Sequence, residues 1–135
     1  MAIETAKVIA HSSQPELVAI AGELTKYRYR YRGEIQLQDG MQYVLEQAGY
    51  QVERERVLGP RRQRGDLWID GLVVEVKVDG SLSAALRQVS DYMQCATVRG
   101  VILASTERWA KTPLQHLPEW GGKPFMMIQV QRQCL

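Results

Sequence analysis

The chain has 135 residues, of which 45% are hydrophobic and 24% charged, and its formal net charge is +2. This length and composition fit a single globular domain with its own core and leave too few residues for two independent domains. No stretch approaches the ~20 consecutive apolar residues that a membrane-spanning helix needs, so we expect no membrane partner.

Cysteine usage points to a reducing compartment. The two cysteines, Cys95 and Cys134, form neither a CxxC motif nor a Cys/His pair at zinc-ligand spacing. A disulfide framework and a zinc site are therefore not expected. We expect a cytoplasmic protein.

The N-terminal segment combines a short strand with a helix in our prediction. Residues 5–11 alternate weakly between apolar and polar, which is compatible with a strand, and Pro15 is placed to open a helix. We treat residues 1–32 as an N-terminal extension of a core that covers residues 33–135. Its role, as a subunit interface or as packing on the core, is left open.

An alternating aromatic and basic run closes this extension. In an extended Tyr27–Arg32 segment, the three tyrosines face one side and Arg28, Arg30 and Arg32 the other. Such arginines suit binding to nucleic-acid phosphates, and tyrosines stack on bases. A solvated strand whose tyrosines pack inward is equally compatible.

Helical spacing of apolar residues predicts a helix over residues 34–48, ended by Gly49. Glu34 falls near the apolar stripe, which directs it toward the core. An acid in the first turn is also favoured by the helix dipole alone.

Residues 50–57 follow as an increasingly charged strand, which suits a sheet edge. The next loop carries Arg61, Arg62 and Arg64, and it is either a phosphate clamp or a solvated loop.

Residues 65–70 and 72–78 read as an antiparallel hairpin around Asp70-Gly71, a favoured tight-turn pair. Alternation places Glu75 and Lys77 on one face of the second strand, and pairing across the turn brings Asp66 near Glu75. A carboxylate among apolar strand residues is costly unless it is paired or binds a cation. Asp66, Glu75 and the backbone carbonyl of Val76 form an oxygen ligand set suited to Mg²⁺ or Mn²⁺. An exposed Glu–Lys pair is the alternative reading.

Beyond the hairpin, Ser81 can cap a helix over residues 81–95, in which Gln88 and Tyr92 align four residues apart. The pair could reach the same edge of the sheet, although this spacing also occurs by chance in amphipathic helices. Buried strands are expected at 98–105 and 125–131. The first of these should run parallel to the 72–78 strand because a helix connects them.

Taken in order, Asp66, Glu75-Val76-Lys77 and the Gln88-x-x-x-Tyr92 helix resemble the PD-(D/E)xK, or restriction-endonuclease-like, nuclease superfamily, with the helix motif of its RecB-like branch. Glu34 in the preceding helix fits the pattern as well, while Gly65 stands where a proline is usual. The resemblance covers roughly residues 33–105.

The resemblance implies an α/β domain with a mixed central sheet flanked by helices, in two or three layers. It also implies a metal-dependent deoxyribonuclease that hydrolyses DNA phosphodiester bonds, in repair, recombination or the processing of phage or mobile-element DNA. Asp66, Glu75, Val76 and Glu34 would hold Mg²⁺ or Mn²⁺, and Lys77 and Gln88 would complete the catalytic set. Tyr92 would contact the DNA, together with these arginines: Arg28, Arg30, Arg32, Arg61, Arg62 and Arg64.

Two other functions remain open. One is a junction- or flap-selective endonuclease acting as a homodimer, because a small domain has little surface with which to discriminate DNA forms alone. The other is a noncatalytic nucleic-acid-binding or assembly module that keeps the fold. It would bind DNA in a salt-dependent way without metal-dependent turnover.

Overall fold

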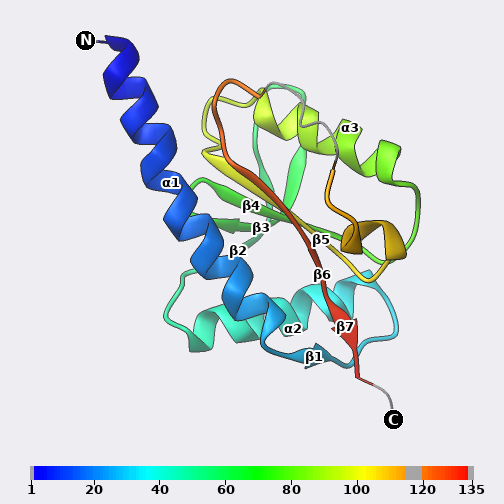
Figure 1. Ribbon diagram of the computed structural model, residues 1–135. Coiled ribbons are helices and arrows are strands. Elements are labelled where there is room, and N and C mark those ends of the chain that lie inside the picture. Colours follow the sequence, from blue (N-terminus) through cyan, green and yellow to red (C-terminus); the bar gives the residue numbers. More distant parts are fainter. Residues whose placement is uncertain (1, 115–119, 134–135) are drawn as a thin grey trace.

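The protein is an α/β domain, described here from a computed structural model that covers residues 2–114 and 120–133 (Figure 1). In chain order the elements are α1 (Ala2–Thr25), β1 (Arg28–Tyr29), α2 (Glu34–Gln47), β2 (Glu53–Val57), β3 (Arg64–Ile69), β4 (Leu72–Lys77), α3 (Leu82–Met93), β5 (Gly100–Ser105), the 3₁₀ turn η1 (Arg108–Lys111), β6 (Phe125–Gln129) and β7 (Gln131–Arg132). Cys134 lies outside the described residues, and Cys95 is a buried free thiol.

A five-stranded mixed sheet in the order β2-β3-β4-β5-β6 forms the centre of the domain. The pairs β2–β3 and β3–β4 are antiparallel, whereas β4–β5 and β5–β6 are parallel. The parallel crossover through α3 was predicted and is confirmed. So is the position of β2 at a sheet edge, where its charged side chains meet solvent.

Helices cover both faces of the sheet, so the domain has three layers (Figure 1). Alternation along the strands divides the buried side chains into two clusters. One lies under α1 and α2 and includes Leu67, Val74 and Val76, and the other lies under α3 and includes Trp68 and Val73. The predicted mixed sheet flanked by helices is therefore confirmed.

The β3–β4 hairpin forms because both residues of its turn adopt positive φ, 47° at Asp70 and 92° at Gly71. Such a turn matches the right-handed twist of the strands. Glycine is needed at position 71, since a Cβ there would lie 2.8 Å from Nε of Arg99. The backbone N–H of Arg99 donates to the Gly71 carbonyl at 2.7 Å, which ties the turn to the segment before β5.

The strand expected at residues 5–11 is wrong, because these residues belong to α1, and Pro15 lies inside that helix rather than at its start. Ala2, Ala6 and Ala10, with Glu4 and Lys7, are strong helix formers, and their preference outweighs the weak alternation of apolar and polar residues.

No helix of the described residues has the length and apolar character to cross a membrane.

Residues of the N-terminal segment share the core of the domain. Leu17, Ile20 and Leu24 are fully buried in the same cluster as Leu37 and Val74. The boundary expected at residue 32 therefore separates two parts of one hydrophobic core. The Arg99 guanidinium adds polar contacts to α1, donating to Ser13 Oγ and Glu16 Oε2, both at 3.1 Å.

The C-terminal strand predicted over residues 125–131 is divided after β6. Val130 is buried, and β7 then leaves the main sheet and pairs in parallel with β1. Strands β2 and β5 begin at residues 53 and 100, later than the predicted 50 and 98. Tyr50 and Val52 still pack inward, but as part of the segment that leads into β2.

We predict that Ile20→Ala lowers the free energy of unfolding by about 2–5 kcal/mol, because it leaves a cavity where α1 meets the core. Val18→Ala is the matched control on the same helix, since Val18 is 48% exposed, and it should change stability by no more than about 0.5 kcal/mol. Urea unfolding of the full chain measures both. Equal stability of the two variants would contradict a shared core.

Candidate active site

The hairpin register brings the two central carboxylates together. Leu67 pairs with Val74 and Trp68 with Val73. One position further along the same register, Asp66 lies opposite Glu75. Cross-strand neighbours of this kind have their Cβ atoms ~5 Å apart. The predicted proximity of these two acids is thus a direct result of the turn at Asp70-Gly71.

Asp66 reaches into the edge of β4. Its Oδ2 accepts a hydrogen bond from the backbone N–H of Val76 at 2.8 Å. Because the N–H and C=O of one strand residue point to the same side, the Val76 carbonyl is also directed toward β3. Burial raises the pKa of Asp66, while the Val76 N–H and a hydrogen bond with Glu75 oppose that rise.

Glu75 is only 1% exposed, although it is an acid. Its Oε1 accepts a hydrogen bond from the Tyr92 hydroxyl at 3.0 Å. Its Oε2 lies 3.3 Å from Nζ of Lys77 but has no hydrogen-bond partner. Burial raises the pKa of Glu75 from 4.5 to about 8, the Asp66 charge adds to the rise, and Lys77 opposes it. Burial therefore favours the protonated form of Glu75.

Tyr92 lies behind Glu75, on the core side of the site, and is 1% exposed. Its hydroxyl lies 2.8 Å from the Arg64 carbonyl as well as 3.0 Å from Glu75 Oε1, and a phenol has only one proton to donate. Gln88 Nε2 donates to the same hydroxyl at 2.8 Å. The resemblance implied that Tyr92 contacts DNA and that Gln88 acts in catalysis. In the structure Tyr92 is buried, and its hydroxyl contacts Glu75 and Gln88 inside the domain.

Glu34, in the first turn of α2, faces the same region from the opposite layer. Its Oε1 is buried and has no hydrogen-bond partner. Burial and the charge of Asp66 raise the pKa of Glu34, whereas Lys77 lowers it. The charges of Asp66 and Lys77 thus reach Glu34, and Asp66 in turn hydrogen-bonds with Glu75.

Two further acids, Glu55 and Asp79, interact with this group of residues, and the sequence analysis did not predict either of them. The charges of Glu55 and Asp79 raise the pKa of Glu34, and that of Glu55 also raises the pKa of Asp66. Glu55 has φ of 54°, in the left-handed region, and falls opposite Asp66 in the β2–β3 register. The sequence alone could not identify Glu55 as the neighbour of Asp66. The pairing of β2 with β3 depends on how many residues the loop between them contains, and this number was not known.

The predicted basic clusters differ in how far they are neutralised. Arg54 donates to Asp39, Gln42 and Gln38 of α2, and Arg56 pairs with Glu53 and lies over Trp68. Within the described ranges, no ion pair is formed by the exposed arginines of the predicted DNA-binding set, which are Arg28, Arg30, Arg32, Arg61, Arg62 and Arg64.

Part of the aromatic and basic run packs inward. Tyr29 is buried, its hydroxyl donates to the Leu24 carbonyl at 2.7 Å, and Tyr31 is half-buried against the same cluster. The inward packing of tyrosines is therefore confirmed for Tyr29. It leaves the intervening arginines exposed.

The donor set fits a hard divalent cation. Carboxylate and carbonyl oxygens are the ligands that Mg²⁺ and Mn²⁺ prefer, and two carboxylate oxygens, Glu34 Oε1 and Glu75 Oε2, are buried without hydrogen bonds. No three His, Cys, Asp or Glu side chains of the described residues already stand in a metal-binding arrangement. Hollows of about 270 and 540 Å³ lie elsewhere, and none of these site acids lines them.

Comparisons of the chain with protein families, curated proteins and solved structures each find no match. The site must therefore be interpreted from its own chemistry.

We predict that the metal-free protein loses stability as the pH rises from 4.5 to about 8, because Glu75 holds its proton more tightly when folded. The slope should reach at most about 1.4 kcal/mol per pH unit. Urea unfolding in EDTA at several pH values measures it. Glu75→Gln should flatten the slope, whereas Glu46→Gln, on the exposed face of α2, should retain it. An unchanged slope in Glu75→Gln would contradict the assignment.

Proposed function

We propose that this protein is a Mg²⁺- or Mn²⁺-dependent deoxyribonuclease that hydrolyses DNA phosphodiester bonds, with a restriction-endonuclease-like core. One observation carries the proposal. Glu75 is buried opposite Asp66, its Oε2 has no hydrogen bond, and the Lys77 ammonium lies 3.3 Å away. Two acids and an amine in one small volume suit cation-assisted phosphoryl transfer better than they suit packing.

Four groups of the chain would hold the cation. They are the carboxylates of Asp66, Glu75 and Glu34 and the carbonyl of Val76. A bound divalent cation polarises the scissile phosphate, lowers the pKa of a water and neutralises developing negative charge. For Glu75 to serve, its proton must leave, so binding should strengthen as the pH approaches about 8.

Lys77 would serve as the catalytic amine. It is partly exposed, unlike Glu75, and lies next to it on the same face of β4. Its ammonium can donate hydrogen bonds both to the attacking water and to a phosphate oxygen, and so orient one against the other. General acid–base or orienting groups of this kind contribute about 10²–10⁴-fold to a rate.

Tyr92 and Gln88 are positioning residues in this proposal. Tyr92 holds Oε1 of Glu75 on the core side, which leaves Oε2 directed toward Lys77. Gln88 fixes the Tyr92 hydroxyl in turn. The exposed arginines Arg61 and Arg62 of the loop before β3, and Arg64 at the start of β3, would contact backbone phosphates without reading sequence.

We expect purified protein to cut duplex DNA with Mg²⁺ or Mn²⁺ and to lose that activity in EDTA. Asp66→Asn, Glu75→Gln and Lys77→Met should each lower the rate at least about 100-fold. Asp70→Asn is the matched control at the far end of β3, since the Asp70 side chain is 95% exposed. Equal cutting by Asp66→Asn and Asp70→Asn would show that the assigned centre is wrong.

The choice of substrates separates the related possibilities. Cutting of covalently closed circles excludes a strict exonuclease, and preferential cutting of four-way or flap substrates would favour a structure-selective enzyme. Salt-dependent DNA binding with no metal-dependent cutting would instead identify a noncatalytic module.

A further inference from the structure

A two-stranded ribbon joins the basic segments from the two ends of the chain. In it β1 and β7 run parallel, with Arg28 opposite Gln131 and Tyr29 opposite Arg132. The N–H of Gln133 extends the pairing by donating to the Tyr29 carbonyl at 2.8 Å. Arg132 is thereby brought beside arginines that lie about a hundred positions earlier in the sequence.

Arg132 is held in place but is not neutralised. Its guanidinium carbon lies 4.9 Å from the centre of the Tyr31 ring, and Nη2 donates to the Tyr31 carbonyl at 2.9 Å. A guanidinium has five N–H donors, so this contact leaves most of them for a ligand. Stacking on the Tyr31 ring also orders the Arg132 side chain in advance, which lowers the conformational entropy that this side chain loses when it binds a ligand.

The ribbon carries a concentration of unpaired positive charge. In the part of the chain that the structure describes, no ion pair is formed by the exposed arginines of the ribbon and of the segment after β1, which are Arg28, Arg132, Arg30 and Arg32. Lys26, next to the ribbon, is in contrast paired with Glu23 at 2.9 Å. Unpaired arginines in a cluster attract a polyanion.

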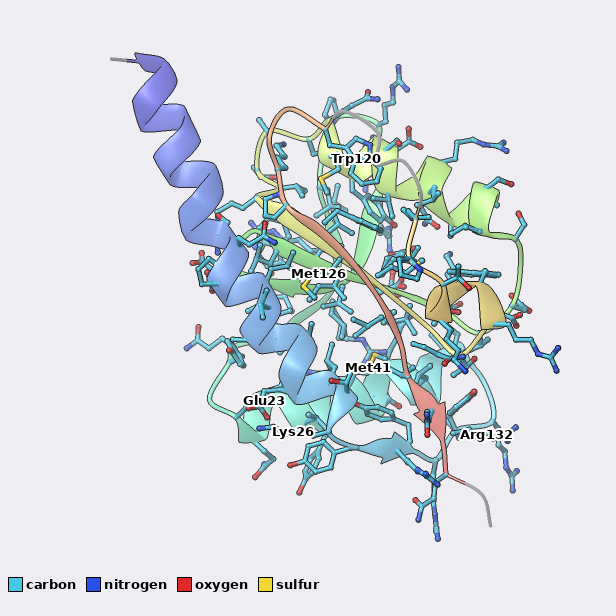
Figure 2. The ribbon with its side chains drawn as sticks, viewed as in Figure 1. Glu23, Lys26, Met41, Trp120, Met126 and Arg132 are labelled. Atoms are coloured by element: carbon cyan, nitrogen blue, oxygen red, sulfur yellow. The ribbon has the colours of Figure 1, made fainter. Side chains whose placement is uncertain are left out.

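The ribbon lies at the same end of the sheet as the candidate active site. Strand β6 runs parallel to β5 and β4, so β7 continues from the end of the sheet at which Glu75 and Lys77 lie. Tyr31, on which Arg132 stacks, precedes Glu34 by three positions. Figures 1 and 2 show β1 and β7 side by side below the sheet, with Arg132 on β7 and Lys26 at the end of α1.

We propose that Arg132, held on Tyr31, binds a backbone phosphate of the DNA at the end of the sheet where Glu75 and Lys77 lie. The identity of the polymer rests on the proposed function. The guanidinium fork matches phosphate oxygens in a bidentate way, and the exposed Arg28 and Arg30 lie in β1 and directly after it. Arg132 therefore extends the DNA-binding surface to the C-terminal end of the chain.

The test is DNA binding by the full chain in EDTA, which needs no cleavage. Fluorescence anisotropy of a labelled duplex is followed against salt concentration. Arg132→Ala should weaken binding equally for unrelated sequences and reduce the magnitude of the salt slope by about 0.9, the value for one lost phosphate contact. Arg132→Lys should retain most of the slope but weaken binding, because the fork and the stack are lost.

Three controls separate this role from a structural one. Tyr31→Phe keeps the ring and should bind as the native protein does, whereas Tyr31→Ala should weaken binding. Lys26→Ala removes a cation that is already paired and should leave the slope unchanged. If Arg132→Ala shows the same salt dependence of DNA binding as the native protein, with unchanged thermal unfolding, the inference is overturned even if the protein cuts DNA. Loss of slope in a protein that never cuts would support the contact and refute the nuclease.

Discussion

A buried carboxylate opposite a second carboxylate is the constraint on which the site depends. Glu75 is almost fully removed from water and has Asp66 as its cross-strand neighbour. Taking a charged acid into a sheet interior is costly, and a second acid beside it increases the cost. Burial favours the protonated form of Glu75, as its raised pKa of about 8 indicates. In the function that we propose, a divalent cation would replace that proton.

The surrounding elements each supply one part of this arrangement. The β3–β4 turn sets the register of the two acids, and α3 places Tyr92 under Glu75. From the other layer, α2 begins with Glu34 at the same end of the sheet. Arg54 links α2 to the edge strand β2 through Gln38 and Asp39. The site is therefore built between two layers, and its geometry depends on the packing of both helices against the sheet.

The hairpin and its acids could be predicted because local chemistry determines them. Asp70-Gly71 selects a tight turn, and strand alternation then fixes which side chains share a face. The same holds for α2, whose apolar spacing predicted its limits to within a residue. The β1–β7 ribbon had no such signal, since it pairs residues about a hundred positions apart. Likewise, the left-handed conformation of Glu55 and its place opposite Asp66 depend on how the β2–β3 loop closes.

The position of Tyr92 illustrates why the sequence predicts which face of a helix a residue occupies better than it predicts how deeply that residue is buried. The sequence placed Tyr92 and Gln88 on one helix face and near the sheet edge, but it could not set their depth. Depth depends on how closely α3 approaches β4, which is a property of the core under it, and here Tyr92 packs in the cluster with Val73 and Val89. At that depth the hydroxyl meets Glu75 rather than solvent. The hydroxyl therefore contributes a hydrogen bond to a buried carboxylate.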